Sequence, residues 1–281
     1  MALPVENGEE LDLERLEIEL LLEGIHRRYG FDFRDYAPAS LRRRLRRRMD
    51  GEKVETISAL QDLLLHDATV MERLLLDLSV NVTAMFRDPT FFLRVREKLV
   101  PHLRSYPFSR IWVAGCSTGE EVYSLAIVLA EEGLADRVRI YATDINQTVI
   151  ESAKLGVFPL EKMQEYTQNY IRAGGTRPFS EYYVARYDGA RFARSLVDGA
   201  VFAQHNLVSD AAFNEFNVIV CRNVMIYFAE PLQERVHQLF YESLATFGVL
   251  ALGQKETIRF SPHAERYEEL DAEERLYKKV R

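Results

Sequence analysis

The sequence predicts an α/β domain that follows an all-helical N-terminal domain and carries a small antiparallel β-subdomain as an insertion. Three changes along the 281 residues indicate this fold class. Residues 1–80 place apolar side chains at helical spacing, whereas from residue 110 short apolar runs alternate with helical patterns, as in βαβ units. Residues 166–203 break that alternation, because they are rich in Tyr, Phe and Val and contain three turn signals with glycine.

The N-terminal part is expected to form a helical domain, residues 1–80, and a linker with a helix, residues 81–100. Within the helical domain, Asp50-Gly51 is the expected break between two helices. In the linker, Asp88 is predicted to cap a helix that has Pro89 at its first position and runs to about residue 99.

The α/β domain is expected to span residues 101–281. Apolar runs predict its strands at residues 111–114, 138–143, 216–221 and 248–253, and helical patterns predict helices at 120–131, 147–153 and 231–245. A further short strand is expected to end just before Asn206. Since parallel strands end at the same edge of a sheet, the residues that follow them should meet there.

Composition excludes several classes of protein. No apolar run approaches the roughly 18 residues that a membrane span needs, and Met1 to Glu10 does not resemble a signal peptide, so the chain is expected to be cytoplasmic. Cys116 and Cys221 lie far apart, outside any CxxC or Cys/His cluster, which argues against a disulfide framework and against a metal site.

Charge is distributed unevenly around a net value of −7. Residues 1–24 hold eight acidic side chains against one arginine, whereas residues 40–49 hold six arginines. These are Arg42, Arg43, Arg44, Arg46, Arg47 and Arg48. The second stretch therefore faces either water or an anionic partner.

A glycine turn follows the first predicted strand of the α/β domain. Gly115 lies between that strand and the next helix, where a ligand can approach the backbone closely. The spacing is GxxxG rather than GxGxxG, and Glu120 and Glu121 begin the helix, where they would repel a pyrophosphate. A ligand with a cationic ammonium or sulfonium group fits this turn better.

Polar residues follow two more predicted strands. Asp144 ends the second strand, and a carboxylate there can accept both hydroxyls of a ribose; the plain alternative is that Asp144 caps the next helix. Arg222, Asn223 and Tyr227 come after the strand at 216–221 and should face the same crevice. The sequence thus predicts one pocket built from several strand ends.

Five motifs together resemble the chemotaxis receptor methyltransferase family, often called CheR-type. They are residues 81–88 (NVTAMFRD), 114–121 (AGCSTGEE), 142–145 (ATDI), 206–207 (NL) and 221–228 (CRNVMIYF). The resemblance covers nearly the whole chain. It implies a Rossmann-like methyltransferase domain that uses S-adenosylmethionine, yields S-adenosylhomocysteine, and methylates receptor glutamates to γ-glutamyl esters.

The resemblance also implies roles for individual residues. Asn81, Thr83 and Arg87 would line the methyl-donor end of the cofactor site, and Glu120, alone or with Glu121, would meet the amino-acid part of the cofactor. Asp144 would hold the ribose. The remaining cofactor-binding positions would be Gly115, Asn206, Leu207, Arg222 and Asn223. Arg87 and Tyr227 would be the catalytic residues that orient the substrate.

The chemistry is consistent with this implication. Methyl transfer from a sulfonium to a carboxylate removes both charges, so the main task is alignment in a dry site. A glutamate is already ionised near neutral pH, and neither a general base nor a metal is required. Arg87 can hold a carboxylate through two hydrogen bonds; the plain alternative is a surface arginine that pairs with Asp88 or another acid.

The arginine stretch has three interpretations. It is a solvated basic helix, a nucleic-acid site, or a docking surface for the acidic methylation helices of a receptor. The sequence disfavours nucleic acid because aromatic residues are not interleaved with the arginines and the pI is low. In a docked helix, Arg43, Arg46 and Arg47 could address the partner while Leu41, Leu45 and Met49 pack inward. The family resemblance favours docking.

Other partners and functions stay open at this stage. Some family members bind a peptide at the receptor's C-terminus through the β-subdomain, for which residues 172–176 are a candidate loop. A methyltransferase that acts on a small molecule or nucleic acid would have the same fold. A catalytically silent module that senses S-adenosylmethionine is disfavoured, because Arg87 and Tyr227 accompany every cofactor motif.

Overall fold

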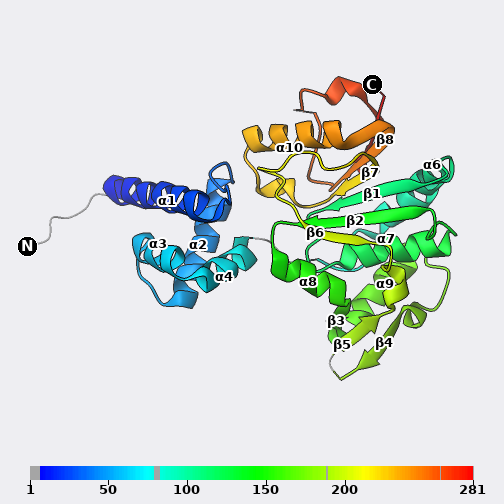
Figure 1. Cartoon of the computed structure of the whole chain (residues 1–281), viewed down its shortest axis with the longest axis horizontal. Coiled ribbons are helices and arrows are strands. Elements are labelled where there is room, and N and C mark those ends of the chain that lie inside the picture. The colour runs from blue at the N-terminus through cyan, green and yellow to red at the C-terminus, as the bar shows by residue number, and fades with distance from the viewer. Residues whose placement is uncertain (1–6, 79–82, 188, 260, 281) are drawn as a thin grey trace, which may run out of the picture. The chain divides into compact units, whose positions relative to one another are not determined.

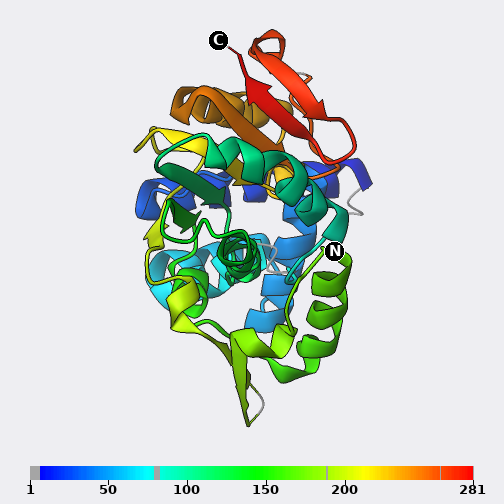
Figure 2. The same ribbon diagram turned by 90° about the vertical axis from the view of Figure 1, so that its right-hand side faces the viewer.

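The computed structural model describes residues 7–78, 83–187, 189–259 and 261–280, with side chains from residue 12 onward. Contacts within the chain define two units (Figures 1 and 2). One comprises Met1–Val80 with Tyr227–Leu232, and the other comprises Asn81–Ile226 with Gln233–Arg281. Across these described ranges, none of the helices is long and apolar enough to cross a membrane.

The first unit is helical, as predicted. Its helices are α1 (Asn7–Tyr29), α2 (Pro38–Glu52), α3 (Ile57–His66) and α4 (Ala68–Leu78). Their buried faces include Leu21, Leu45, Leu60 and Leu74. The break after α2 comes later than Asp50-Gly51, because Lys53 takes the left-handed conformation, at φ 58°, and its N–H bonds to the Asp50 carbonyl.

Helix α2 carries the six arginines, and its orientation is partly as predicted. Leu41 and Leu45 are buried, whereas Arg43, Arg46 and Arg47 are exposed. The prediction that all six arginines face a partner is wrong for two of them. Six arginines within seven residues surround the helix, so the inward face, which the leucines mark, must also receive arginines.

Arg44 and Arg48 are the two that turn inward. Arg44 is only 5% exposed, and its Nη1 donates to the Leu78 carbonyl. Arg48 forms ion pairs with Asp77 and Glu52, and its Nε lies 2.7 Å from Asp77 Oδ2. These two side chains fix α2 within the helical unit and are not available to a docked partner.

The second unit is built on a seven-stranded sheet with the order β6-β2-β1-β7-β8-β10-β9. The strands are β1 (Ser109–Ala114), β2 (Val138–Asp144), β6 (Val201–Gln204), β7 (Phe216–Cys221), β8 (Leu244–Leu252), β9 (Tyr267–Asp271) and β10 (Leu276–Lys279). The first five pair in parallel, which confirms the predicted parallel sheet, and β9 and β10 add an antiparallel edge that was not predicted.

Helices cover both faces of this sheet. Side chains alternate along β1, so Ile111 and Val113 enter the core that α7 (Glu120–Glu131) also lines. On the other face, the Trp112 ring lies 5.5 Å from Phe240 of α10 (Glu230–Ser243). Figure 1 shows α7 and α8 (Gln147–Leu155) on the opposite face of the sheet from α10.

A continuous helical segment precedes β1. It consists of α5 (Pro89–Arg94), a π-helical turn (Val95–Leu99) and α6 (Val100–Arg104), so it extends five residues beyond the predicted end. Pro89 is the first helical residue, as predicted, but Asp88 does not cap the helix through its side chain. Asp88 stands at the N-cap position, as predicted, but its carboxylate pairs with Arg222 at 2.7 Å and does not bond to the amides of the helix.

A second, three-stranded antiparallel sheet forms the β-subdomain, in the order β3-β5-β4. Its strands are β3 (Val157–Pro159), β4 (Tyr183–Arg186) and β5 (Gly189–Phe192), and the helix α9 (Met163–Arg172) lies between β3 and β4 in the chain. The antiparallel strands therefore begin earlier than residue 166. The last residues of the predicted insertion belong to β6, which pairs with β2 in the large sheet.

The sequence predicted antiparallel strands where the structure has the helix α9, and this error has a simple cause. Met163, Tyr166 and Tyr170 repeat at helical spacing and are buried, but aromatic residues are also typical of strands. Gly174-Gly175 ends α9 rather than forming a hairpin, since the Gly175 N–H bonds to the Tyr170 carbonyl at 3.0 Å. Short 3₁₀ helices lie at Leu160–Lys162, Phe179–Tyr182, Arg194–Leu196, Met225–Tyr227 and Ala264–Arg266.

Candidate active site

The carboxyl ends of β1, β2 and β7 form the candidate site. β1 pairs with β2 on one side and with β7 on the other, and the chain reverses the strand order at this point, where ligands bind in open α/β sheets. The amides of Gly115 and Cys116 both donate to the Thr143 carbonyl, at 2.8 and 2.9 Å. The turn after β1 is thereby attached to the end of β2.

Gly115 allows the loops after β1 and β7 to approach each other. Its φ is 77°, and a Cβ at this position would lie 2.5 Å from a methyl group of Val224. Ser117 and Asn223 also have positive φ, at 49° and 62°. Left-handed non-glycine residues are uncommon and often occur at functional sites, so their presence on two adjacent loops supports this location for the site.

Asp144 is 7% exposed and holds the turn after β1. Its Oδ2 accepts the Ser117 N–H at 2.9 Å, and its Oδ1 accepts the Asn146 N–H at 3.0 Å. The alternative that Asp144 caps α8 is wrong, because Asn146 is the N-cap and accepts the Thr148 N–H. Burial raises the pKa of Asp144, while the backbone donors oppose that rise.

The surroundings of Asp144 fit a polar, uncharged ligand group such as a ribose or a nucleobase. Asn146 is 2% exposed, and its Nδ2 atom is buried without a hydrogen-bond partner among the described residues. No cation among those residues pairs with Asp144. A buried carboxylate and a buried amide donor therefore retain hydrogen-bonding capacity that a ligand could satisfy.

Glu120 and Glu121 begin α7 but have different surroundings. Glu120 is 5% exposed, accepts bonds from Thr118 Oγ1 at 2.6 Å and Tyr166 Oη at 3.4 Å, and has no cationic partner in the described ranges. Burial raises its pKa. Glu121 is paired with Arg222 at 2.7 Å. Of the two carboxylates, Glu120 is the one whose charge remains available to a cationic ligand.

Arg222 joins the loop after β7 to the segment that carries Arg87. Its side chain is 2% exposed and forms ion pairs of 2.7 Å with both Asp88 and Glu121. Its guanidinium lies 4.0 Å from the centre of the Phe91 ring, and both Nη atoms donate to the Arg87 carbonyl at 3.3 Å. Arg222 is thus engaged by protein groups, and its contact with adenosine stays a prediction.

The remaining residues of the 81–88 motif lie before α5. Thr83 and Arg87 are half-buried, and Asn81 lies outside the described residues. Phe86 anchors this segment, because its N–H donates to Ser124 Oγ on α7 at 2.9 Å and its ring packs against Tyr170 of α9. The backbone at Arg87 is therefore fixed from two sides.

Asn206 and Leu207 follow β6, next to β2. The His205 N–H donates to the Asp144 carbonyl at 3.0 Å, which brings this loop to the end of β2. Asn206 is buried, and its Oδ1 accepts the Val208 N–H at 3.0 Å, whereas Leu207 is half-buried. The structure thus places Gly115 and Asn206 on loops that are hydrogen-bonded to the end of β2, where Asp144 lies.

Tyr227 belongs to the helical unit by its contacts. Its carbonyl accepts the Ala37 N–H at 3.0 Å, and the guanidinium of the buried Arg44 lies 4.4 Å from its ring centre. The ring of the neighbouring Phe228 packs against that of Tyr36 in a tilted arrangement, with centroids 5.0 Å apart. The catalytic role of Tyr227 stays a prediction.

The sequence analysis did not predict two buried polar residues at the carboxyl edge of the sheet, an asparagine and a glutamate. Asn146 comes two residues after Asp144, and Glu256 comes four residues after the end of β8 and contacts the loop that follows β7. The available signal was the position of Glu256 just beyond a parallel strand, where the other candidates also lie.

Comparisons with known proteins agree with this geometry. The family model described as CheR methyltransferase, SAM binding domain, matches residues 81–274, and the model described as CheR methyltransferase, all-alpha domain, matches residues 16–79. Fold and site together define an α/β methyltransferase that uses S-adenosylmethionine. The chain belongs to the CheR methyltransferase family.

Individual relatives are similar over most of the chain. A Pseudomonas putida protein named Cher3 is 47% identical over 264 residues, which cover 94% of this chain and 97% of that protein. A chemotaxis protein methyltransferase of Listeria innocua is 28% identical, covering 83% and 87% of the two chains. One of Salmonella typhimurium is 33% identical, covering 64% and 61%.

Proposed function

We propose that this enzyme transfers the methyl group of S-adenosylmethionine to glutamate side chains of a chemoreceptor-type protein. Family membership supports the donor, and the names of relatives as chemotaxis protein methyltransferases support the acceptor. The structural observation that carries the proposal is Glu120, a buried carboxylate without a cationic protein partner among the described residues, on a strand-end site with Asp144. A ligand with both a cationic ammonium and a ribose suits that pair.

In the proposed reaction the chain positions the reactants and adds no chemical group. S-adenosylmethionine supplies the methyl group on a sulfonium. Asp144 accepts from the ribose, and Glu120 accepts from the ammonium group of the amino-acid part. Arg87 holds the ionised glutamate of the substrate so that one oxygen faces the methyl carbon. Since opposite charges disappear in this displacement, exclusion of water and alignment produce the rate.

The direct test is incubation of the protein with methyl-labelled S-adenosylmethionine and membranes that contain chemoreceptors. The expected product is label in receptor protein that base releases as methanol, because esters are labile and methylated amines are not. Base-stable label, or label in nucleic acid or small molecules, would indicate another methyltransferase. Cofactor binding without any transfer would indicate a sensor module.

Glu120 predicts a pH dependence of cofactor binding. Its pKa is raised by burial in the free protein, and a bound ammonium group should lower it, so binding at a pH below the raised pKa should release a proton. Affinity for S-adenosylhomocysteine should therefore rise with pH below the raised pKa of the free protein, and level off above it. Calorimetry in two buffers of different ionisation enthalpy measures this proton release.

The control for this prediction is Glu120→Gln, which keeps the size of the side chain and removes its titration. It should bind more weakly and show no proton release at this position. An unchanged proton release in Glu120→Gln would assign the titration to another group, such as Asp144.

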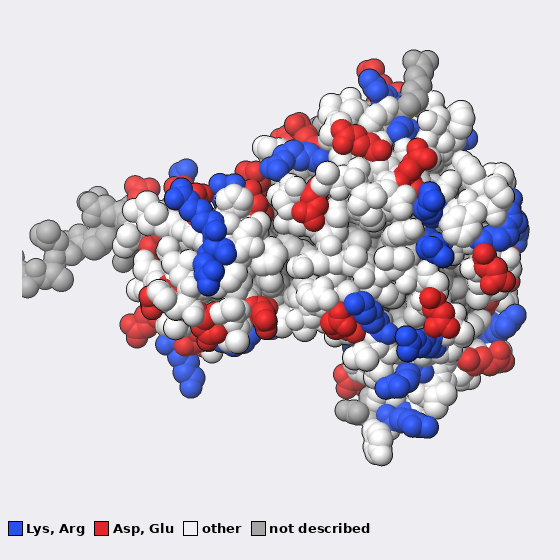
Figure 3. All heavy atoms as spheres, in the orientation of Figure 1, with Lys and Arg blue, Asp and Glu red and all other residues white. Residues whose placement is uncertain are grey.

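We further propose that α2 docks on the acidic methylation helices of the receptor, through Arg43, Arg46 and Arg47 only. Figure 3 shows basic side chains gathered in a strip over the helical unit, with acidic ones beside it. Arg46 and Arg47 approach Glu14 and Asp77, at 3.0 and 3.5 Å, but remain 70% and 80% exposed. Such surface pairs contribute little, so the arginines can exchange them for a partner's carboxylates.

Reversing two of these charges, in Arg43→Glu with Arg46→Glu, should raise the apparent KM for receptor several-fold and leave cofactor affinity intact. The difference from wild type should shrink at high salt, where exposed charges are screened. The matched control is Arg15→Glu with Arg27→Glu, which makes the same charge change on α1, at side chains that are 74% and 78% exposed. Equal KM values for both double variants would mean that α2 is a solvated surface.

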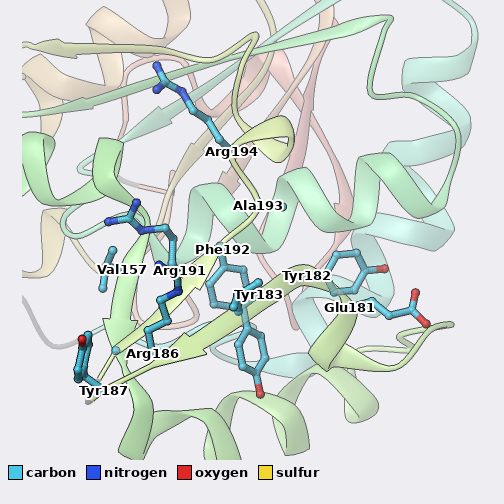
Figure 4. Close-up of a pocket in the computed structure, with 12 residues that line it drawn as sticks. Val157, Glu181, Tyr182, Tyr183, Arg186, Tyr187, Arg191, Phe192, Ala193 and Arg194 are labelled. Atoms are coloured by element: carbon cyan, nitrogen blue, oxygen red, sulfur yellow. The ribbon is translucent and has the colours of Figure 1, made fainter.

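A peptide from the receptor C-terminus is the second partner that we propose, at the edge of the β-subdomain. A cavity of about 670 Å³ lies there, lined by both strands of the β4–β5 hairpin and by basic side chains that include Arg186, Arg191 and Arg194 (Figure 4). β3 and β4 are the edge strands, and Pro159 removes one N–H donor from β3, so β4 is the edge that can accept an added strand.

The loop at residues 172–176, which was the sequence candidate for this contact, ends α9 and does not line the cavity. Removal of the receptor's last residues in the methylation assay tests the tether. It should raise the apparent KM, and an unchanged KM would leave α2 as the site of docking. Both proposed contacts require the enzyme to work in the cytoplasm, where such methylation helices lie.

A further inference from the structure

Glu256 is a buried carboxylate that none of the roles above uses. It is 5% exposed and lies four residues beyond β8. Its two oxygens accept four backbone N–H groups: Oε1 accepts from Val224 and Met225 at 2.9 and 2.8 Å, and Oε2 accepts from Asn223 and Gly253 at 2.9 and 2.7 Å. One side chain thereby joins the loops that follow β7 and β8.

This arrangement is unusual for a buried acid, because ionised carboxylates in protein interiors are normally paired with a cation. Of the described residues, no Lys, Arg or His forms an ion pair with Glu256, and backbone amides alone satisfy it. Three consecutive amides that point at one anion form a concave binding surface of the kind that proteins use for phosphate. In this protein the anion at that surface is the carboxylate of Glu256.

The loop that Glu256 holds contains candidate active-site residues. Arg222 and Asn223 begin it, and Tyr227 follows it closely. Asn223 has the left-handed φ of 62°, a conformation that is strained for a non-glycine residue unless its surroundings stabilise it. Hydrogen bonds from its own amide and the next two to Glu256 stabilise that conformation.

Gly253 shows how closely the two loops approach. A Cβ on Gly253 would lie 2.7 Å from Glu256 Oε2 and 2.9 Å from the Asn223 nitrogen. Only glycine leaves room for the carboxylate and the loop at the same time. The contact between the loops thus depends on both residues, which provides two independent ways to disturb it.

We propose that Glu256 is a positioning residue of the active site, which fixes the loop of Asn223–Met225 so that cofactor and substrate are aligned. This inference rests on the proposed function for the identity of the reaction. Its first test measures only binding of S-adenosylhomocysteine. The result would therefore stand even if the proposed glutamate substrate proved wrong.

The test is Glu256→Gln, an isosteric change that places an NH₂ group against backbone donors. At a temperature well below its own Tm, the variant should bind S-adenosylhomocysteine at least 10-fold more weakly. Methyl transfer at saturating receptor and cofactor should fall at least 10-fold. Backbone amides of Asn223, Val224 and Met225 should exchange hydrogen faster than in wild type, while those of β8 keep their protection.

Glu274→Gln is the matched control. Glu274 is also 5% exposed and accepts weak bonds from Gln254 at 3.4 and 3.5 Å, on the turn between β9 and β10. It should lose stability without a change in cofactor affinity or turnover beyond 2-fold. If Glu256→Gln behaves like this control, the role of Glu256 is structural only and the proposal is wrong.

Gly253→Ala provides a second variant in case Glu256→Gln does not fold. The added methyl group pushes against the same carboxylate and the same amide. It should reproduce the combined loss of affinity and turnover. A folded Gly253→Ala protein with wild-type affinity and turnover would overturn the proposal independently.

Discussion

Asp144→Ala should weaken binding of S-adenosylhomocysteine by about 1.5 to 3 kcal/mol, the range for loss of a charged hydrogen-bond acceptor. This corresponds to roughly 10- to 150-fold in Kd. Asp144 lies at the end of β2, is 7% exposed, and has no cationic partner among the described residues, so its charge is available to ribose hydroxyls. Isothermal titration calorimetry measures the change directly.

Asp144→Ala also removes two hydrogen bonds within the protein. A control must therefore separate the effect of a weakened turn from the effect of a lost contact with the ligand. Asp67 accepts the Thr69 N–H at 2.9 Å in the same i to i+2 pattern, but in the helical unit. Asp67→Ala should cost a small amount of stability and leave Kd unchanged. An unchanged Kd in folded Asp144→Ala would remove Asp144 from the cofactor site.

Arg87→Ala should lower turnover at least 10-fold at saturating receptor and cofactor, because alignment of the acceptor carboxylate is lost in the transition state. The variant should still fold. Arg222 holds the carbonyl of residue 87, and the N–H of residue 87 bonds to the Ala84 carbonyl at 3.3 Å, so neither bond needs the Arg87 side chain. Single-turnover methylation of receptor measures the chemical step.

Arg94→Ala is the control for charge. Arg94 lies on α5, close to Arg87 in the sequence, and pairs with Glu97 and Asp271. Its replacement should leave turnover within 2-fold of wild type. Full turnover in Arg87→Ala with weaker cofactor binding would make Arg87 a cofactor contact and would contradict the alignment role.

The sequence by itself determined the fold class and the sheet edge at which the candidate residues lie. Alternation of apolar runs and helical patterns from residue 110 predicted the parallel strands, since this pattern depends only on local periodicity. Because parallel strands end at one edge, the position of Gly115, Asp144 and Asn206 at or just beyond the ends of their strands was enough to bring them to the same edge. Motifs in the chain also pointed to the family that the comparisons show.

Periodicity was less informative where the residue types of a segment suit both a helix and a strand. The aromatic residues of α9 lie at helical spacing yet are typical of strands, so residues 166–172 were placed in the antiparallel insertion. β9 and β10 were missed, because the antiparallel pairing of β10 with β8, and of β9 with β10, depends on contacts along the sheet edge.

Only the tertiary structure decided which charges are available at the surface and in the site. Glu120 and Glu121 are adjacent and chemically identical, but of these two only Glu121 pairs with the buried Arg222. Arg44 and Arg48 turn inward on a helix where Arg43, Arg46 and Arg47 remain exposed. Glu256 is 33 residues from Asn223, and its role rests on four backbone amides that no side-chain pattern reveals. Ion pairs and backbone hydrogen bonds between distant segments form only when the sheet assembles them, and so they cannot be read from local sequence.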